Sequence, residues 1–173
     1  MVLLLNLAVA TVMVAVTFSI HFAGLVGLTA LLRHQGNRLR GPLSTIGQGV
    51  GILVVVFSLF ALHSLQIWLY AFAYLFVGEL HQIETAVYFS TSTFTTVGFG
   101  DVILSHNWRM LGVAESMNGF LLISWSTAFL VSLTTYRKLV LAEYHIGYFA
   151  YGWALGEALI IAKVILIGQA MHL

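Results

Sequence analysis

The sequence predicts an all-α integral membrane protein with three to four transmembrane helices and one re-entrant helix that enters the membrane without crossing it. Three observations predict this fold class. Hydrophobic residues make up 60% of the 173 residues and charged residues only 8%, whereas a soluble domain carries about 25% charged residues. The mean hydropathy is +0.98. The apolar residues also gather in runs that can cross roughly 30 Å of hydrocarbon as helices.

Composition also limits the partners and the chemistry. The net charge of +1 argues against nucleic acid as a partner, and membrane lipid is the expected surrounding. The chain has no cysteine, so it has neither a disulfide framework nor a cysteine-based metal site. No hydrolase or metal constellation is visible, and we therefore expect no enzyme activity and no cofactor.

The first half of the chain contains two long apolar runs. Residues 2–32 form the first predicted span, and residues 46–77 form the second. The loop of residues 33–42 between them carries positive charge and the only proline. A polar segment, residues 78–84, follows the second span. We expect this segment to lie outside the hydrocarbon.

Residues 85–95 are too short to cross the bilayer, which predicts a half-helix that leads into a polar, glycine-containing segment, residues 92–101. Non-helical backbone at membrane depth is tolerated only where it is buried in protein or lines a water-filled path. Gly98 and Gly100 permit positive φ at alternate positions, so successive carbonyls can turn to the same side. A ring of such carbonyls can replace the water shell of a cation, which requires several copies of the chain around one axis.

Residues 109–135 form the next predicted span, and positive charge follows it. Arg109 lies on one side of the membrane, and five basic residues lie on the other: Arg33, Arg38, Arg40, Arg137 and Lys138. The positive-inside rule then places the five basic residues in the cytoplasm and the N-terminus and the mouth of the polar segment outside.

The segment Thr95-Thr96-Val97-Gly98-Phe99-Gly100-Asp101 resembles the selectivity-filter signature of the potassium channel superfamily. The resemblance extends from about Glu79 to about Lys138. It implies a small bacterial pore-only channel with an added N-terminal span, in which a pore helix and filter from each copy build a homotetrameric pore. It also implies K⁺ as the permeant ligand and the plasma membrane or cell inner membrane as the location.

The resemblance assigns the site residues. The carbonyls of Thr96, Val97, Gly98 and Phe99 and the Thr96 hydroxyl are the expected K⁺ ligands, and Gly100 and Asp101 form the outer mouth. Support for the filter is expected from Thr95, from Ser92 and from Tyr88, whose hydroxyl stands where the family has an aromatic donor to the aspartate. The chain departs from the family at Phe99, usually tyrosine, and at Ser92, where some members carry glutamate. Both departures remove hydrogen bonds around the filter.

Polar residues inside the third span suggest further roles. Glu115 is expected either to support the pore helix through Ser90 or Ser92 or to be a buried, protonated carboxyl. Gly119 aligns with the hinge glycine of the family's inner helix, and close packing is the alternative. The expected inner-helix and cavity residues are Asn118, Gly119, Phe120, Ile123, Thr127, Val131 and Thr135.

Three parts are expected along the chain. Residues 1–45 form a peripheral span and cytoplasmic loop, residues 46–138 the pore domain, and residues 139–173 an apolar helix of unknown role. The last part is a further span, an amphipathic surface helix, or part of a longer or joined chain. The predicted function is a potassium-selective channel subunit. A non-selective monovalent cation channel and a non-conducting regulatory membrane subunit remain as alternatives.

Overall fold

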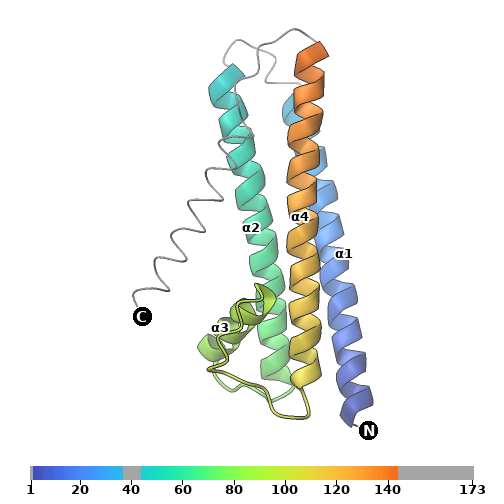
Figure 1. Ribbon diagram of the computed structural model, residues 1–173, viewed down its shortest axis with the longest axis vertical. Coiled ribbons are helices and arrows are strands. Elements are labelled where there is room, and N and C mark those ends of the chain that lie inside the picture. Colours follow the sequence, from blue (N-terminus) through green and yellow to red (C-terminus); the bar gives the residue numbers. More distant parts are fainter. Residues whose placement is uncertain (1, 37–43, 144–173) are drawn as a thin grey trace. The chain divides into compact units, whose positions relative to one another are not determined.

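The computed structural model of the chain describes the backbone of residues 2–36 and 44–143, and the side chains of residues 3–32 and 49–135. Figure 1 shows the four helices of this part: α1 (Val2–Gly36), α2 (Ser44–Phe76), α3 (Ile83–Phe94) and α4 (Arg109–Glu143). No strand occurs in it, and three helices are long and apolar enough to cross a membrane. The predicted all-α membrane class is confirmed.

The three candidate spans lie close to the predicted ones. They cover Leu3–Leu32 in α1, Gly49–Phe76 in α2 and Arg109–Thr135 in α4. The third span ends at Thr135, as predicted from the positive charge that follows it, while its helix continues to Glu143. Arginine and lysine end a hydrophobic span, but both are good helix formers and do not end the helix itself.

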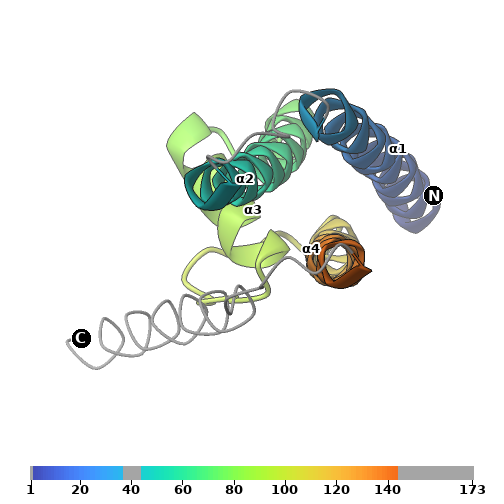
Figure 2. The same cartoon turned by 90° about the horizontal axis from the view of Figure 1, so that it is seen from above.

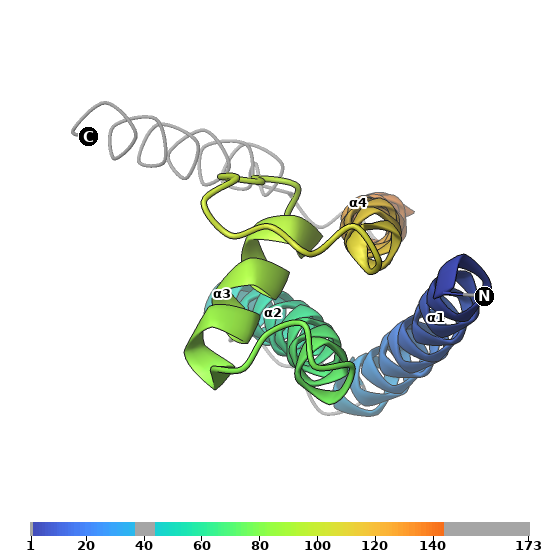
Figure 3. The ribbon, with the colours of Figure 1, turned by 90° about the horizontal axis from the view of Figure 1, so that it is seen from below.

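The chain divides into two compact units, Met1–Trp125 and Ser126–Leu173, and all contacts discussed below lie within the first. The end views place α2 between α1 and α3 (Figures 2 and 3). Helices α1 and α2 approach closely at Gly24, where an added Cβ would lie 2.7 Å from Leu62 Cδ2. A small residue at such a crossing lets two helices pack tightly in lipid.

Helix α2 ends at a glycine cap. Gly78 has φ +77, a conformation that a side chain disfavours. The amides of Glu79 and Leu80 donate to the carbonyl of Tyr74, so the last turn is closed and the chain reverses. Helix α3 then begins at Ile83. Its 12 residues make it about 18 Å long, which confirms that this helix is too short to cross the bilayer.

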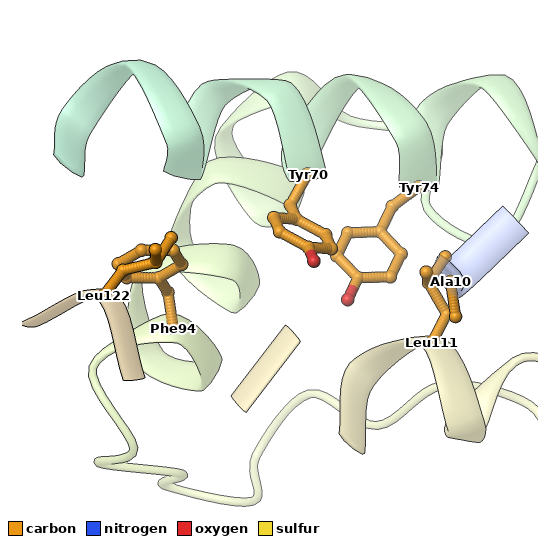
Figure 4. Packing of buried hydrophobic residues seen from close by; sticks show 6 residues of the cluster. All are labelled: Ala10, Tyr70, Tyr74, Phe94, Leu111 and Leu122. Carbon is orange, nitrogen blue, oxygen red and sulfur yellow. The ribbon is translucent and has the colours of Figure 1, made fainter. Parts of the chain in front are cut away.

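One hydrophobic cluster joins all four helices in the first unit. Ala10 comes from α1, Phe94 from α3, and the remaining members come in pairs from α2 and α4: Tyr70, Tyr74, Leu111 and Leu122. Figure 4 shows the two tyrosine rings leaving α2 on the same side. The end of α3 is therefore packed against the spans, which fixes where the following segment starts.

The last predicted part of the chain is residues 139–173. Residues 139–143 belong to α4, and residues 144–173 lie outside the described residues. The three alternatives for this part, and the domain boundaries at residues 45 and 138, therefore stay predictions.

Candidate functional site

The end of α3 determines where the predicted filter segment begins. Thr95 caps the helix, and its amide and hydroxyl both donate to the carbonyl of Thr91, at 3.1 and 2.7 Å. The amide of Thr96 donates to the carbonyl of Thr93 at 3.0 Å. These bonds satisfy carbonyls that a helix end leaves without partners. The chain therefore leaves the helix at Thr96.

The sign of φ alternates along residues 96–100. Thr96, Gly98 and Gly100 have φ of +62, +55 and +79, and the two residues between them do not have positive φ. An alternating sign of φ allows successive N–H groups to turn to one side and successive carbonyls to the other. The positive φ predicted for the two glycines is thus confirmed. Thr96 was not predicted to adopt it.

Positive φ at Thr96 is energetically unfavourable. A left-handed conformation costs a residue with a Cβ roughly 1–2 kcal/mol, and threonine is β-branched as well. Such backbone outliers persist only where the surrounding structure enforces them, and they cluster at functional sites. Here the pattern continues over residues 96–100, so Thr96 extends the row of aligned carbonyls by one position.

The two sides of this segment differ in hydrogen bonding. The amide of Gly98 donates to the carbonyl of Ser92 at 3.1 Å, and the amide of Phe99 donates to Ser92 Oγ at 3.3 Å. The carbonyls of residues 96–99 accept no hydrogen bond from any residue that the structure describes, and the segment is exposed. The N–H side therefore faces α3, and the carbonyl side faces away from it.

The outer end of the segment is tied to α3. Tyr88 Oη donates to Asp101 Oδ2 at 2.8 Å, and the amide of Val102 donates to Asp101 Oδ1 at 3.1 Å. The rings of Tyr88 and Phe99 stack, with centroids 6.4 Å apart and planes 8° from parallel. A cavity of about 110 Å³ lies between α3 and the segment. The expected hydrogen bond between Tyr88 and Asp101 is present.

This hydrogen bond leads to a prediction about alkaline pH. The bond to Asp101 raises the pKa of Tyr88 above its ordinary value of 10.0, because the bond needs the phenol proton. Its contribution to stability is therefore complete below pH 10.0 and is lost as the pH rises through the higher folded-state pKa. Tyr88→Phe removes the bond at every pH, so the variant is expected to start less stable and to lack this alkaline loss.

The measurement is the thermal unfolding temperature of both proteins as a function of pH, with phenolate absorbance followed in parallel. The difference between the two proteins isolates Tyr88 from the other groups that titrate there. A constant difference from pH 8 to the alkaline limit would contradict the proposed role of the phenol proton.

Glu115 is fully buried, and it joins three helices. Tyr74 Oη of α2 donates to Glu115 Oε2 at 2.5 Å, and Ser90 Oγ of α3 is bonded to Glu115 Oε1. Ser90 Oγ also lies 2.8 Å from the carbonyl of Ile67. The single hydroxyl proton of Ser90 can serve only one of these two acceptors. A protonated Glu115 would supply the other proton, and every contact would then be satisfied.

Substitution of Glu115 tests this arrangement. Glu115→Leu leaves the buried Tyr74 hydroxyl without its acceptor, and a buried polar group in that state costs about 1–3 kcal/mol. We therefore expect a loss of about that size per chain. Glu115→Gln should behave like the native protein, because its amide can donate to Ser90 and its carbonyl can accept from Tyr74. Chemical unfolding of both variants measures this, and an equal loss in the two would mean that an ionised carboxylate is required.

The aromatic residues at the end of α2 do not form one interfacial belt. Trp68, Phe72 and Phe76 are exposed, as lipid-facing or interfacial side chains would be, but Tyr70 and Tyr74 are fully buried. The two tyrosines lie four positions apart on one helix face, and both hydroxyls are bonded inside the first unit. Tyr74 was not predicted as a partner of Glu115; the spacing of the two tyrosines was the available signal.

Helix α4 contains both packed and exposed predicted residues. Asn118 is buried and donates to Thr17 and Tyr70, so its amide is used between helices of one chain. An added Cβ at Gly119 would overlap the carbonyl oxygen of Phe94. The remaining predicted cavity residues are exposed or half-buried on α4: Phe120, Ile123, Thr127, Val131 and Thr135.

The sequence of this region matches a known family. A model of the family described as "Ion channel" matches residues 50–136, which is half of the chain. The chain belongs to the ion channel family. The match covers α2 from Val50 onward, the whole of α3 and most of α4, and it leaves α1 outside. Neither the curated proteins nor the solved structures contain a significant match to the chain.

Proposed function

We propose that the chain is the subunit of a potassium-selective channel, with residues 96–100 as its filter. The observation that carries the proposal is the alternating backbone of this segment, with φ positive at Thr96, Gly98 and Gly100. The amides of Gly98 and Phe99 donate to Ser92, and the carbonyls of residues 96–99 accept no hydrogen bond from the described residues. Carbonyl oxygens in such a row suit a hard monovalent cation.

One chain supplies one wall of a pore, so the proposal requires a closed ring of copies. Filters of this kind are built from four equivalent loops, and we propose a homotetramer. The K⁺ ligands are then the carbonyls of Thr96, Val97, Gly98 and Phe99 with the hydroxyl of Thr96. The C-terminal end of α3 directs the negative end of its dipole toward the start of this segment, which favours a cation there.

The proposal includes an inner cavity and an orientation in the membrane. Phe120, Ile123, Thr127, Val131 and Thr135 are proposed to line the cavity, and Asn118 is left out because it is buried between helices. Asn6 donates to the carbonyl of Asn107, so the start of α1 lies at the same end as the segment after the filter. The positive-inside rule then places both outside a plasma or inner membrane. The chain acts as a passive conductor and not as an enzyme.

Flux from purified protein tests the proposal. Protein reconstituted into liposomes should release potassium down its gradient without a second protein, and sodium flux should be much smaller. The mass of the detergent-solubilised complex should equal four chains. No flux from correctly assembled protein would favour a non-conducting subunit, and a conducting monomer or dimer would contradict the ring model.

A non-selective cation channel is a second candidate, and one observation favours it. Phe99 has no hydroxyl, and its exposed ring contacts Tyr88 by stacking alone. Stacking restrains the carbonyl positions less strictly than an added hydrogen bond. Equal potassium and sodium fluxes in the same liposomes would establish this alternative.

A further inference from the structure

Helix α1 lies outside the matched family region, yet its packed face carries polar as well as apolar side chains. Asn6, Thr17 and His21 are all fully buried, and their spacing of 11 and 4 positions places them on one helix face. In lipid, buried polar side chains face other helices and bond across to them. Helix α1 is therefore joined to the pore region by specific contacts and not by apolar packing alone.

One of these contacts reaches the inner helix. Asn118 Nδ2 of α4 donates to Thr17 Oγ1 of α1 at 2.7 Å, and also to Tyr70 Oη of α2 at 3.1 Å. The Thr17 hydroxyl donates its own proton to the carbonyl of Met13 at 2.8 Å. Thr17 can therefore only accept from Asn118, and this fixes the orientation of the Asn118 amide.

Gln66 of α2 also contacts this part of α1. Gln66 is fully buried, and its Nε2 donates to the backbone carbonyl of Thr17 at 3.3 Å and to His21 Nδ1 at 3.2 Å. The backbone oxygen of Thr17 can only accept, so it fixes which end of the Gln66 amide faces α1. Both the hydroxyl and the carbonyl of Thr17 are thus used between helices.

The position of Asn118 connects these contacts of Thr17 to the proposed filter. The next residue, Gly119, lies directly on the carbonyl of Phe94, where an added Cβ would overlap that oxygen. Phe94 is the last residue of α3 and stands two positions before Thr96. Residues 118–119 of α4 therefore contact α1 through Asn118 and the end of α3 through Gly119.

We infer that Thr17 is a positioning residue for the filter: its hydroxyl, acting through Asn118, fixes α4 against the end of α3 and so fixes the carbonyls of the innermost ion site. The inference rests on the proposed channel function. Carbonyls that are already in place bind an ion without a reorganisation cost. Loss of this contact should therefore lower the affinity of the filter for potassium.

The test compares three variants of α1. Thr17→Val removes the hydroxyl at nearly the same volume, and Thr17→Ser keeps it. Thr11→Val is the matched control, because the exposed Thr11 hydroxyl donates only to the carbonyl of Leu7 in its own helix, at 2.8 Å. The readout is the thermal unfolding temperature of the assembled protein over a series of potassium concentrations, with sodium keeping the ionic strength constant.

In Thr17→Val, the potassium concentration that gives half of the stabilisation should rise about three-fold. This ratio corresponds to the free energy of an average interhelical hydrogen bond in a membrane. The ratio of potassium to sodium flux in liposomes should fall with it. Thr17→Ser and Thr11→Val should match the native protein in both measurements. If Thr17→Val does not assemble, Thr17→Ala serves in its place, because it removes the same hydroxyl.

The outcomes separate positioning from simple packing. A lower unfolding temperature in Thr17→Val with an unchanged potassium dependence would overturn the inference and leave Thr17 with a structural role. If the native protein shows selective flux and Thr17→Val matches it in every measurement, the inference is wrong but the proposed function stands. Native protein without flux and without stabilisation by potassium would overturn the proposed function, and this inference with it.

Discussion

Replacing Gly98 with alanine is expected to abolish potassium flux or its selectivity over sodium, while the protein still assembles. Gly98 has φ +55, and a left-handed conformation costs alanine roughly 1–2 kcal/mol. In a proposed ring of four chains, this amounts to roughly 4–8 kcal/mol per pore. An alanine that relaxes to negative φ would turn its carbonyl away from the ion path and remove one ring of ligands.

Within one chain, the cost of alanine at position 98 is conformational and not steric, because no atom lies within 4 Å of the position that a Gly98 Cβ would take. The measurement is potassium and sodium flux from liposomes that hold equal amounts of native and variant protein. Gly27→Ala is the matched control: this helical glycine also has no atom within 4 Å of an added Cβ and has no positive φ. Alanine there should be neutral or slightly stabilising. Unchanged selective flux in Gly98→Ala would mean that residues 96–100 are not the filter.

Replacing Gly119 with alanine is expected to destabilise the protein and to stop conduction. The added Cβ would overlap the carbonyl oxygen of Phe94 and would lie 2.8 Å from its carbonyl carbon and 2.9 Å from its Cα. These are backbone atoms of α3 and cannot rotate away. Overpacking of this kind costs about 1–3 kcal/mol per chain. Helix α4 must move off α3, which also moves the start of the proposed filter.

Unfolding of the assembled protein and flux in liposomes measure this effect together. Gly112→Ala is the control on the same helix, because its nearest contacts are movable side-chain atoms, Leu104 Cδ1 at 3.3 Å and Phe89 Cζ at 3.5 Å. It should cost less. The experiment also separates the two interpretations of Gly119. A variant with native stability and altered gating would favour a hinge, and a destabilised variant would favour close packing.

Much of the fold could be predicted because its signals are local. An apolar run of sufficient length specifies a spanning helix through the cost of placing backbone and charge in hydrocarbon, so the three spans were found within a few residues. The third span ends at Thr135 as predicted, while α4 continues to Glu143, because charge marks the limit of a span and not of a helix. The glycine positions predicted positive φ at Gly98 and Gly100, and the structure has it at both.

Contacts between distant residues could be predicted only where a known pattern placed them. The hydrogen bond from Tyr88 to Asp101 spans 13 positions and follows from the family resemblance. The bond from Tyr74 to Glu115 spans 41 positions and has no such pattern. The left-handed Thr96 was also missed, because a β-branched residue disfavours positive φ locally and only the contacts around it can enforce that conformation.

By itself, the sequence determined an all-helical membrane protein with one short helix before a row of carbonyls, because hydrophobic length and glycine positions act within a few residues. Only the tertiary structure decided which polar residues meet. Asn118 faces Thr17 across 101 positions of chain, and Gly119 contacts the carbonyl of Phe94. These contacts depend on how three helices cross, and a crossing is set by the combined packing of all their side chains.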